Sequence, residues 1–234
     1  MNKLICIIPA RGGSKRFPRK NLSTIGNKTL VRRSIDTALD TKIMDKILLT
    51  SDDDEILSQA QEFDNRVETQ KRDESLSNDH TTIKDLTLSI CKSLNSEYKY
   101  ICIILPTAPF TLSKHISEAY GRFIKNSNLD GIVSLTKYEF PPQFSVSLSN
   151  DLIKPAFPNS PLLDGNTRSQ NQEQLFRPNG AFYIYKIDYL FASRSFWNGK
   201  IMGYEMSKNY SVDIDTYEDY LYAQYINEKN KNSS

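Results

Sequence analysis

Five basic side chains lie close together near the start of the chain, in the stretch IIPARGGSKRFPRKN that covers residues 7–21. Such a density of positive charge suits a small polyanion such as a triphosphate. Gly12 and Gly13 allow backbone conformations that turn consecutive N–H groups toward an anion. The stretch matches neither GxxxxGKS nor GxGxxG, so it is not a standard P-loop or dinucleotide fingerprint. We expect phosphate binding here, with a merely solvated basic loop as the alternative.

Two carboxylates lie near the other end of the chain. Asp213 and Asp215 are two positions apart in SVDIDTYEDY, residues 211–220. We expect a strand over 210–215, and side chains two positions apart on a strand point to the same side. Neighbouring carboxylates repel each other, and a hard cation such as Mg²⁺ relieves this repulsion, so the pair predicts a magnesium site. Alternatively, Asp215 is a helix N-cap that forms a capping box with Glu218, which accounts for Asp215 but not for Asp213.

The distribution of charge is more informative than its sum. The net charge is +2, but residues 1–35 hold nine Lys or Arg and no Asp or Glu, so the remaining residues sum to −7. A nucleic-acid binder usually spreads its basic residues along one face with aromatic residues between them. Here the positive charge is local, and we expect a small-molecule partner and no nucleic acid.

Apolar patterns predict the elements that position these residues. Short apolar runs typical of buried parallel strands occupy 4–8, 46–50, 100–105 and 131–135. Helical spacing of apolar residues occupies 31–39, 83–94 and 116–124. Strands and helices that alternate in this way predict an α/β fold with a mostly parallel, doubly wound sheet and right-handed crossovers. The basic stretch follows the first strand, and ligands of such sheets bind at the carboxyl ends of the strands.

The later part of the chain interrupts this rhythm. Five prolines lie among polar residues in 138–176, which predicts an excursion from the sheet such as a hairpin arm. Regular structure is expected to resume at 181–185 and 210–215, and a last helix to cover about 216–228. Because no internal repeat or linker divides the chain, residues 1–234 are expected to form a single domain.

Composition restricts the class of protein. The chain is 38% hydrophobic and 25% charged, which is typical of a soluble globular protein. No apolar run approaches the roughly 20 residues that a membrane span requires. The run LICII (4–8) is too short for a signal peptide and ends in Pro-Ala-Arg. We therefore expect a cytoplasmic protein with no membrane partner.

The cysteines and histidines suggest no redox or metal chemistry. Cys6, Cys91 and Cys102 lie singly within apolar stretches, where core packing is expected. His80 and His115 are isolated in the sequence, so a histidine metal site is not expected.

Taken in order along the chain, these motifs resemble those of the CMP-sialic acid synthetases, the cytidylyltransferases that activate 2-keto sugar acids. The matching stretches are IIPARGGSKRFPRKN (7–21), TSDDDEI (50–56), KRDESLSND (71–79), PTAPF (106–110), RPNGAFYIY (177–185) and DIDTYED (213–219). The first stretch is highly specific, whereas PTAPF or DID alone would be weak. The resemblance implies a Rossmann-like nucleotidyltransferase sheet with a protruding dimerisation arm.

The resemblance also implies the roles of individual residues at the nucleotide. Arg11, Lys15 and Lys20 would hold the phosphates of CTP, and Arg72 would help to recognise the base. The implied nucleotide-binding set is Ala10, Arg11, Gly12, Gly13, Lys15, Lys20, Asn21 and Arg72. The implied catalytic residues are Arg11, Lys20, Asp213 and Asp215, of which the two aspartates would bind Mg²⁺.

On the sugar side, the resemblance implies a pocket lined by Leu105, Arg168, Asn179 and Tyr183. Arg168 lies where the family places an arginine near the sugar acid, although its spacing to NGA is one residue longer. Leu105 stands where many sialic acid synthetases have a glutamine that contacts the sugar, which suggests a different substituent. Phe182 and Ile184, in the same stretch, are expected to be core residues.

The implied reaction is transfer of CMP from CTP to the anomeric hydroxyl of a nine-carbon sugar acid of sialic, legionaminic or pseudaminic type. Mg²⁺ would act at the α-phosphate, and the basic side chains would neutralise the leaving pyrophosphate. An eight-carbon 3-deoxy-octulosonate is the alternative acceptor, and a nucleotide-binding regulatory protein is the alternative without catalysis. Family members pair their subunits through an extension comparable to 138–176, so a homodimer is expected.

Overall fold

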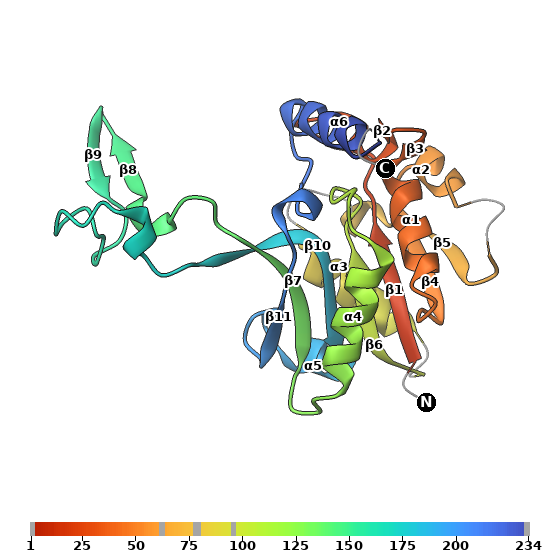
Figure 1. Ribbon diagram of the computed structural model, residues 1–234. Coiled ribbons are helices and arrows are strands. Elements are labelled where there is room, and N and C mark those ends of the chain that lie inside the picture. The colour runs from red at the N-terminus through yellow and green to blue at the C-terminus, as the bar shows by residue number, and fades with distance from the viewer. Residues whose placement is uncertain (1–2, 61–63, 77–80, 95–96, 232–234) are drawn as a thin grey trace.

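The central element of the fold is a sheet that contains seven strands within the described residues, which are 3–60, 64–76, 81–94 and 97–231 of a computed structural model (Figure 1). In chain order the strands are β1 (Lys3–Pro9), β4 (Lys46–Ser51), β5 (Val67–Lys71), β6 (Tyr98–Ile104), β7 (Gly131–Lys137), β10 (Phe176–Lys186) and β11 (Ile201–Glu205). They are ordered β11-β7-β10-β6-β1-β4-β5 across the sheet. Only β10 runs antiparallel to its neighbours among these strands, so the predicted mostly parallel sheet is confirmed.

Helices pack on both faces of the sheet, whereas the last helix packs beyond its edge in a third hydrophobic cluster with Ile25, Leu30 and Ile214 (Figure 1). The helices are α1 (Leu30–Asp40), α2 (Asp54–Ser58), α3 (Ile83–Ser93), α4 (Ser113–Ile124), α5 (Ile187–Ala192) and α6 (Tyr217–Lys231). Helices α1 and α4 share one hydrophobic core with Leu4, Cys6 and Ile8 of β1. Helices α3 and α5 share a second core with Ile5 and Ile7. Alternate side chains of one strand thus enter opposite cores, as the period of a β-strand requires.

Apolar residues that the sequence assigned to the core are buried there. Phe182 and Ile184 are fully buried on β10, which confirms that prediction. Cys6, Cys91 and Cys102 are buried free thiols, and Cys6 lies opposite Cys102 in the register of β1 and β6. The structure therefore confirms the predicted packing role of the three cysteines.

Two boundaries near the end of the chain differ from the prediction. Residues 211–215 form no strand, so the strand predicted over 210–215 is wrong. Isolated hydrogen bonds hold this segment instead of a strand ladder. In one of them, the Ile214 N–H donates to the Thr107 carbonyl at 2.8 Å. The last helix extends to Lys231, three residues beyond the predicted end.

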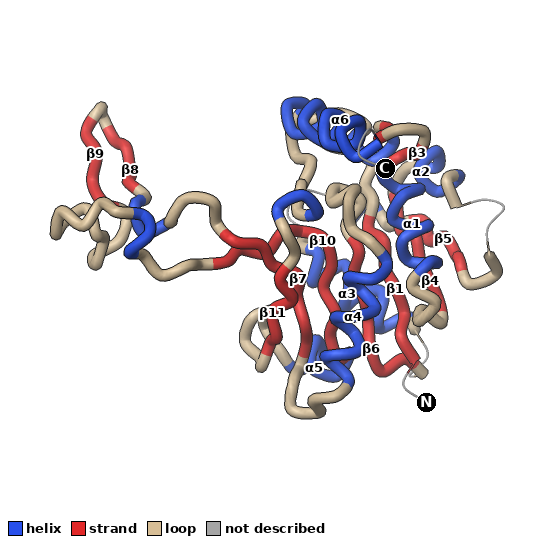
Figure 2. The backbone as a smooth tube through the Cα atoms, in the orientation of Figure 1, coloured by secondary structure: helices blue, strands red, loops and turns tan. Residues whose placement is uncertain are grey.

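Between β7 and β10 the chain leaves the sheet and forms a protruding arm (Figure 1). The arm carries a small antiparallel hairpin of β8 (Val146–Ser149) and β9 (Leu152–Pro155), and Figure 2 shows that most of the rest is loop. Large apolar side chains on it are exposed, with Leu148 and Leu152 each 70% accessible. The predicted excursion therefore exists, and its tip buries little of its own apolar surface.

Shorter elements complete the described chain. They are the pair β2 (Thr24–Ile25) and β3 (Lys28–Thr29), and the 3₁₀ turns η1 (Lys20–Leu22), η2 (Glu74–Leu76), η3 (Pro142–Phe144), η4 (Ser169–Asn171) and η5 (Lys208–Tyr210). In the part of the chain that the structure describes, no helix has the length and apolar character to cross a membrane.

Candidate active site

A cavity of about 550 Å³ opens at the carboxyl ends of β1, β5 and β6. Ligands of open α/β sheets bind at this edge, because the loops that follow the strands meet there. The cavity is lined by the basic loop, which we define as residues 10–20, by the start of α3, by the loop after β6 and by the 213–215 segment. It therefore brings together the two constellations that the sequence analysis placed at opposite ends of the chain.

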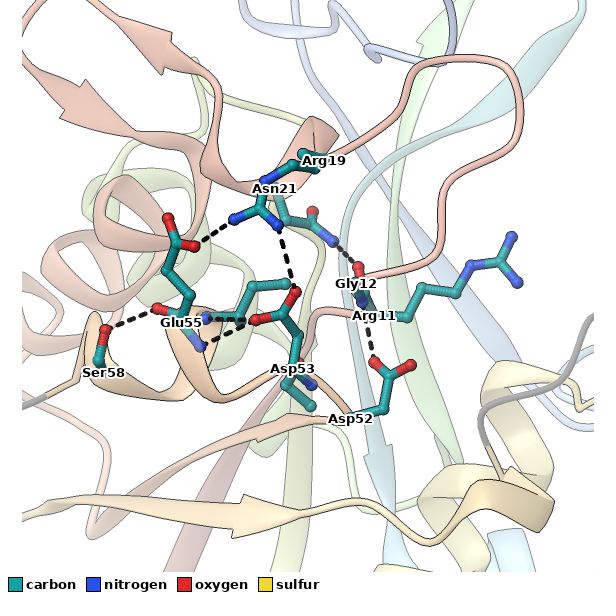
Figure 3. A network of polar contacts seen from close by, with 10 residues as sticks. Arg11, Gly12, Arg19, Asn21, Asp52, Asp53, Glu55 and Ser58 are labelled. Atoms are coloured by element: carbon teal, nitrogen blue, oxygen red, sulfur yellow. Dashed lines mark hydrogen bonds and ion pairs between the residues drawn. The ribbon is translucent and has the colours of Figure 1, made fainter.

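Figure 3 shows how the first half of the basic loop is held. The Gly12 N–H donates to Asp52 Oδ1 at 2.8 Å, and Asn21 Nδ2 donates to the Arg11 carbonyl at 2.8 Å. Asn21 is buried, so its amide supports the loop backbone. The Arg11 side chain extends away from this network toward the cavity that it lines (Figure 3).

The glycine pair serves a different purpose from the predicted one. A Cβ on Gly12 would lie 2.8 Å from the Cβ of Asp53, whereas a Cβ on Gly13 would meet nothing within 4 Å. Neither glycine has a positive φ. The conformational freedom that the sequence analysis ascribed to the two glycines is therefore not used in this structure. Gly12 is needed because Asp53 packs against its Cα and leaves no room for a Cβ. The N–H of Gly12 is already bonded to the Asp52 carboxylate.

The second half of the basic loop is tied to helix α2. Arg19 adopts a left-handed conformation with φ of 55° and forms ion pairs with Asp53, at 4.0 Å, and Glu55. Asp53 also caps α2, because its Oδ1 accepts from the backbone N–H groups of Glu55 and Ile56 (Figure 3). The carboxylates of Asp53 and Glu55, at the start of α2, thus hold Arg19 in its strained conformation immediately before Lys20.

Asp215 meets two cations of the basic loop. Its Oδ1 lies 3.0 Å from Lys20 Nζ, and its Oδ2 lies 2.9 Å from Arg16 Nη2. Partial burial alone would raise the pKa of Asp215, but the hydrogen bonds and charges of Lys20 and Arg16 outweigh it and lower the pKa. The carboxylate is thus held in its ionised form.

Asp215 is not the N-cap of the last helix. Thr216 Oγ1 accepts from the Asp219 N–H at 3.3 Å, and Asp219 Oδ2 accepts from the Thr216 N–H at 2.8 Å. These reciprocal bonds form the capping box of α6. The alternative interpretation of Asp215 as a cap paired with Glu218 is therefore wrong, and its side chain faces the cavity.

Asp213 lies in a drier environment than Asp215. Within the described residues its Oδ1 is buried with no hydrogen-bond partner. Burial raises the pKa of Asp213, as does the charge of Asp215, while Thr107, Lys20 and Arg177 oppose the shift. Gly180 adopts a φ of +74°, and a Cβ there would approach Asp213 Oδ2 to 3.1 Å. Both carboxylates line the cavity although their segment is not a strand.

The remaining nucleotide candidates are distributed between cavity and core. Arg11, Lys15 and Arg72 line the cavity, whereas Ala10 is fully buried and donates its N–H to the Thr50 carbonyl at 3.0 Å. Arg72 Nη2 donates to the same carbonyl at 3.0 Å. Burial lowers the pKa of Arg72, and the neighbouring Asp52 carboxylate opposes this shift.

The predicted sugar-binding residues are not all brought together. Leu105 lines the cavity, and Tyr183 lies near Asp213, whose charge adds to the effect of burial in raising the pKa of the phenol. Asn179 is fully buried, donates to Ser211 Oγ at 2.9 Å and accepts from the Ala181 N–H. Its amide therefore braces the chain beneath the site and does not enter the cavity.

Arg168 lies elsewhere, exposed on the protruding arm immediately before η4. It lines neither of the two cavities to which Asp213 and Asp215 contribute. The chain by itself therefore does not bring this arginine to the acid pair.

The site contains residues that the sequence analysis did not select. A second cavity, of about 640 Å³, shares Arg16, Asp213 and Asp215 with the first and is also lined by Lys137, Arg177 and Lys208. Arg177 and Thr107 belong to the stretches RPNGAFYIY and PTAPF, so motif membership was the available signal. Arg16 also belongs to a motif, IIPARGGSKRFPRKN, but nothing in the sequence indicated its pairing with Asp215, because the two residues lie near opposite ends of the chain.

Histidine and cysteine do not form a metal centre in the described part of the chain. No group of three or more His, Cys, Asp or Glu side chains there is arranged to hold a metal ion. His115 is buried and its Nδ1 accepts from the Leu112 N–H at 3.2 Å. His80, the other histidine of the sequence analysis, lies outside the described residues.

Several named proteins are similar to this chain over 94–99% of its length. The pseudaminic acid cytidylyltransferase of Campylobacter jejuni subsp. jejuni serotype O:2 is 31% identical, with 99% of each chain covered. The CMP-N,N'-diacetyllegionaminic acid synthase of Legionella pneumophila is 25% identical, with 98% of each covered. The N-acylneuraminate cytidylyltransferase of Streptococcus agalactiae serotype V is 28% identical over 94% of this chain and 52% of that protein.

Solved structures share the fold. CMP:2-keto-3-deoxy-manno-octonic acid synthetase complexed with CTP superposes with a TM-score of 0.73, at 15% identity and with 97% of this chain and 99% of the other covered. The 4-diphosphocytidyl-2C-methyl-D-erythritol synthase of Anaerococcus prevotii gives a TM-score of 0.67, at 15% identity and with 95% of each covered. The family model described as Cytidylyltransferase matches residues 5–232. The resemblance drawn from the motifs is confirmed, and the chain belongs to the cytidylyltransferase family, whose members are CTP-dependent nucleotidyltransferases.

Proposed function

We propose that the enzyme transfers CMP from CTP to the anomeric hydroxyl of a nine-carbon 2-keto sugar acid and releases pyrophosphate. The observation that carries this proposal is the meeting of the basic loop and the 213–215 carboxylates in one cavity. The names of similar proteins, which act on pseudaminic, N-acylneuraminic and legionaminic acids, support this class of acceptor. We further propose that the reaction takes place in the cytoplasm, where CTP is available.

In the proposed reaction, the sugar hydroxyl attacks the α-phosphorus, and its proton passes to solvent water as the new P–O bond forms. The bond from the α-phosphorus to the bridging oxygen breaks, and that electron pair leaves with pyrophosphate. Arg11, Lys15 and Lys20 line the cavity and would neutralise the charge of the leaving group, which is the main task in phosphoryl transfer. Arg72, half-buried beside them, would contact the cytosine.

Asp213 and Asp215 fit the Mg²⁺ that the family resemblance implies. Among the described side chains, Asp213 Oδ1 is a buried oxygen without a donor, and a buried charged group without a partner is costly. A hard cation prefers carboxylate oxygen of this kind. The two aspartates would hold the ion, which when bound would supply positive charge at the α-phosphate. Lys20 and Arg16 keep Asp215 ionised and fix its orientation.

The second cavity is the proposed location of the sugar acid. It is contiguous with the first through Arg16, Asp213 and Asp215, and it presents the cationic side chains of Lys137, Arg177 and Lys208. Such side chains suit the carboxylate of the acceptor. Leu105 and Tyr183 would contact the sugar between the two cavities, and Asn179 would support them from beneath.

We also propose that the enzyme is a homodimer joined through the arm. Exposed apolar side chains on the hairpin support this, because an isolated arm would leave them in water. The position of Arg168 gives a second reason, since it lies on the arm and outside the described cavities. In a dimer, Arg168 would serve the sugar site of the other subunit.

The direct test is pyrophosphate release from CTP and Mg²⁺ with N-acetylneuraminate, legionaminate, pseudaminate or 3-deoxy-octulosonate as acceptor. ATP, GTP and UTP serve as nucleotide controls. Release with CTP and a nine-carbon acid supports the proposal and identifies the substituents that the pocket accepts. Release with the eight-carbon acid alone would move the acceptor to the octulosonate class. No release with any acceptor, in an enzyme that still binds CTP, would overturn the acceptor assignment.

A further inference from the structure

Three aromatic rings pack together beside the first cavity, the proposed site of CTP, and one of them lines it. Phe17 of the basic loop lies 5.7 Å from Tyr217 and 5.2 Å from Tyr220, measured between ring centroids, and the two tyrosines are 5.9 Å apart. Both tyrosines belong to α6. Phe17 is half-buried and lines the cavity. A loop near the start of the chain is thus packed against the last helix.

The same contact reaches the carboxylate segment. Phe17 packs against a hydrophobic cluster that includes Val212 and Ile214. These two buried residues alternate with Asp213 and Asp215, which line the cavity. One apolar cluster therefore holds the basic loop on one side and the carboxylate segment on the other.

The neighbours of Phe17 in the loop are the cations that meet Asp215. Arg16 directly precedes it and pairs with Oδ2, while Lys20 pairs with Oδ1 and donates its backbone N–H to the Phe17 carbonyl at 3.3 Å. Fixing a long cationic side chain on a ligand costs conformational entropy. If the backbone beneath it is already rigid, binding does not have to order the backbone as well, so the total entropy cost is lower. The aromatic contact supplies this rigidity at the centre of the loop.

We propose that Phe17 is a positioning residue, which sets the distance between the phosphate-binding cations and the carboxylates of Asp213 and Asp215. It acts through Arg16 and Lys20 and takes no part in bond making. This inference rests on the proposed function of the cavity. It predicts that the loss of the Phe17 ring weakens the binding of CTP and of Mg²⁺ together, because both depend on the spacing between the basic loop and the 213–215 segment.

The test compares Phe17→Ala with Phe17→Leu and with Tyr225→Ala. Tyr225 lies on α6 but is 59% exposed and outside the cavities, so its variant controls for the loss of an aromatic side chain from the same helix. For each protein we would measure the KM for CTP, the KM for the sugar acid, kcat, the Mg²⁺ concentration that gives half the maximal rate, and the melting temperature. Calorimetric titration of CTP in Mg²⁺ adds a binding measurement that needs no acceptor.

Phe17→Ala is expected to raise the KM and the Kd for CTP about tenfold and to raise the Mg²⁺ requirement. The KM for the sugar acid should rise less, because Phe17 does not line the second cavity and reaches it only through Arg16, Asp213 and Asp215. Phe17→Leu should recover most of the loss, and Tyr225→Ala should behave as the wild type. Unchanged CTP and Mg²⁺ dependence in a folded Phe17→Ala enzyme would overturn the inference, as would a change confined to its melting temperature. If the wild type binds CTP but transfers it to no acceptor, the acceptor assignment fails, while the titration still decides the role of Phe17.

Discussion

Lys20 and Asp215 form an ion pair at 3.0 Å although 195 positions separate them in the chain. The side chain of Lys20 is only 12% exposed, whereas that of Asp215 is 44% exposed, so solvent reaches the pair mainly from the side of the carboxylate. Arg16 meets the other oxygen of the same carboxylate. The pair joins the basic loop to the 213–215 segment, so the proposed phosphate site and the proposed Mg²⁺ site lie side by side in one cavity.

Removal of this lysine should impair the use of CTP. Lys20→Ala is expected to lower kcat/KM for CTP by about a hundredfold, because a shielded charge is lost where negative charge develops. The matched control is Lys28→Ala, since Lys28 also pairs with an aspartate, Asp36, but is 47% exposed. Steady-state pyrophosphate release would show a normal rate for the control. A Lys20→Ala enzyme with wild-type kcat/KM would remove Lys20 from the phosphate site.

Substitution of Asp213 should separate stability from activity. Burial raises the pKa of Asp213, so its ionised form destabilises the fold at every pH above its raised pKa. Asp213→Asn removes that charge and should increase the free energy of unfolding at neutral pH by about 1 kcal/mol, while turnover falls at least a hundredfold. Urea denaturation without Mg²⁺ measures the first and pyrophosphate release the second.

The exposed Asp188→Asn is the control for Asp213→Asn and should change neither quantity. A near-normal rate for Asp213→Asn at ordinary Mg²⁺ would contradict the metal assignment. A loss of stability would contradict the conclusion that its buried oxygen is unsatisfied.

The two glycines of the basic loop should respond differently to alanine. Gly12→Ala places a Cβ 2.8 Å from the Cβ of Asp53, a contact that the loop can relieve only by moving away from β4 and α2. We expect a loss of about 2 kcal/mol in the free energy of unfolding. Gly13→Ala meets open space and should be within about 0.5 kcal/mol of the wild type. Equal effects on the melting temperature would show that Asp53 does not restrain the loop.

His115 should make the fold sensitive to mild acid. Burial and the charge of Lys114 lower its pKa from the ordinary value of 6.5, so below that pH the unfolded chain takes up a proton that the folded chain resists. The free energy of unfolding should therefore fall as the pH drops from 6.5 toward the lowered pKa. Protonation would also remove the Nδ1 acceptor for the Leu112 N–H. Denaturation at about pH 7.5 and about pH 5.5 should show a smaller fall for His115→Asn.

Mixed dimers would test the proposed role of Arg168. Arg168→Ala and Asp215→Asn should each be poorly active alone. If Arg168 serves the site of the other subunit, mixing the two variants should restore part of the activity, because one site of each mixed dimer keeps both groups. Sedimentation would establish the dimer independently, and a monomer of 26.9 kDa at working concentration would contradict the proposal. A dimer whose mixtures stay inactive would place Arg168 in its own subunit's site or outside the site.

Local patterns were sufficient for the framework of the protein. The apolar runs at 4–8, 46–50, 100–105 and 131–135 became β1, β4, β6 and β7, because a buried parallel strand needs nothing beyond a short run of apolar, often branched residues. The order of the motifs along the chain identified the family. The sequence placed the basic stretch directly after the first strand. Because the loops after parallel strands all lie at the same edge of the sheet, this position also predicted the edge at which the ligand binds.

Tertiary packing decided what each side chain does at that edge. The 211–215 segment reaches the cavity without forming a strand, held by the bond from Ile214 to Thr107, and Thr216 caps α6 in place of Asp215. Asn179 belongs to a motif, yet its amide is used within the buried network. Periodicity depends on neighbours a few positions apart, so it determined the elements. The pairing of Lys20 with Asp215, and the packing of Phe17 on α6, depend on how distant elements stack, and only the folded chain specifies that.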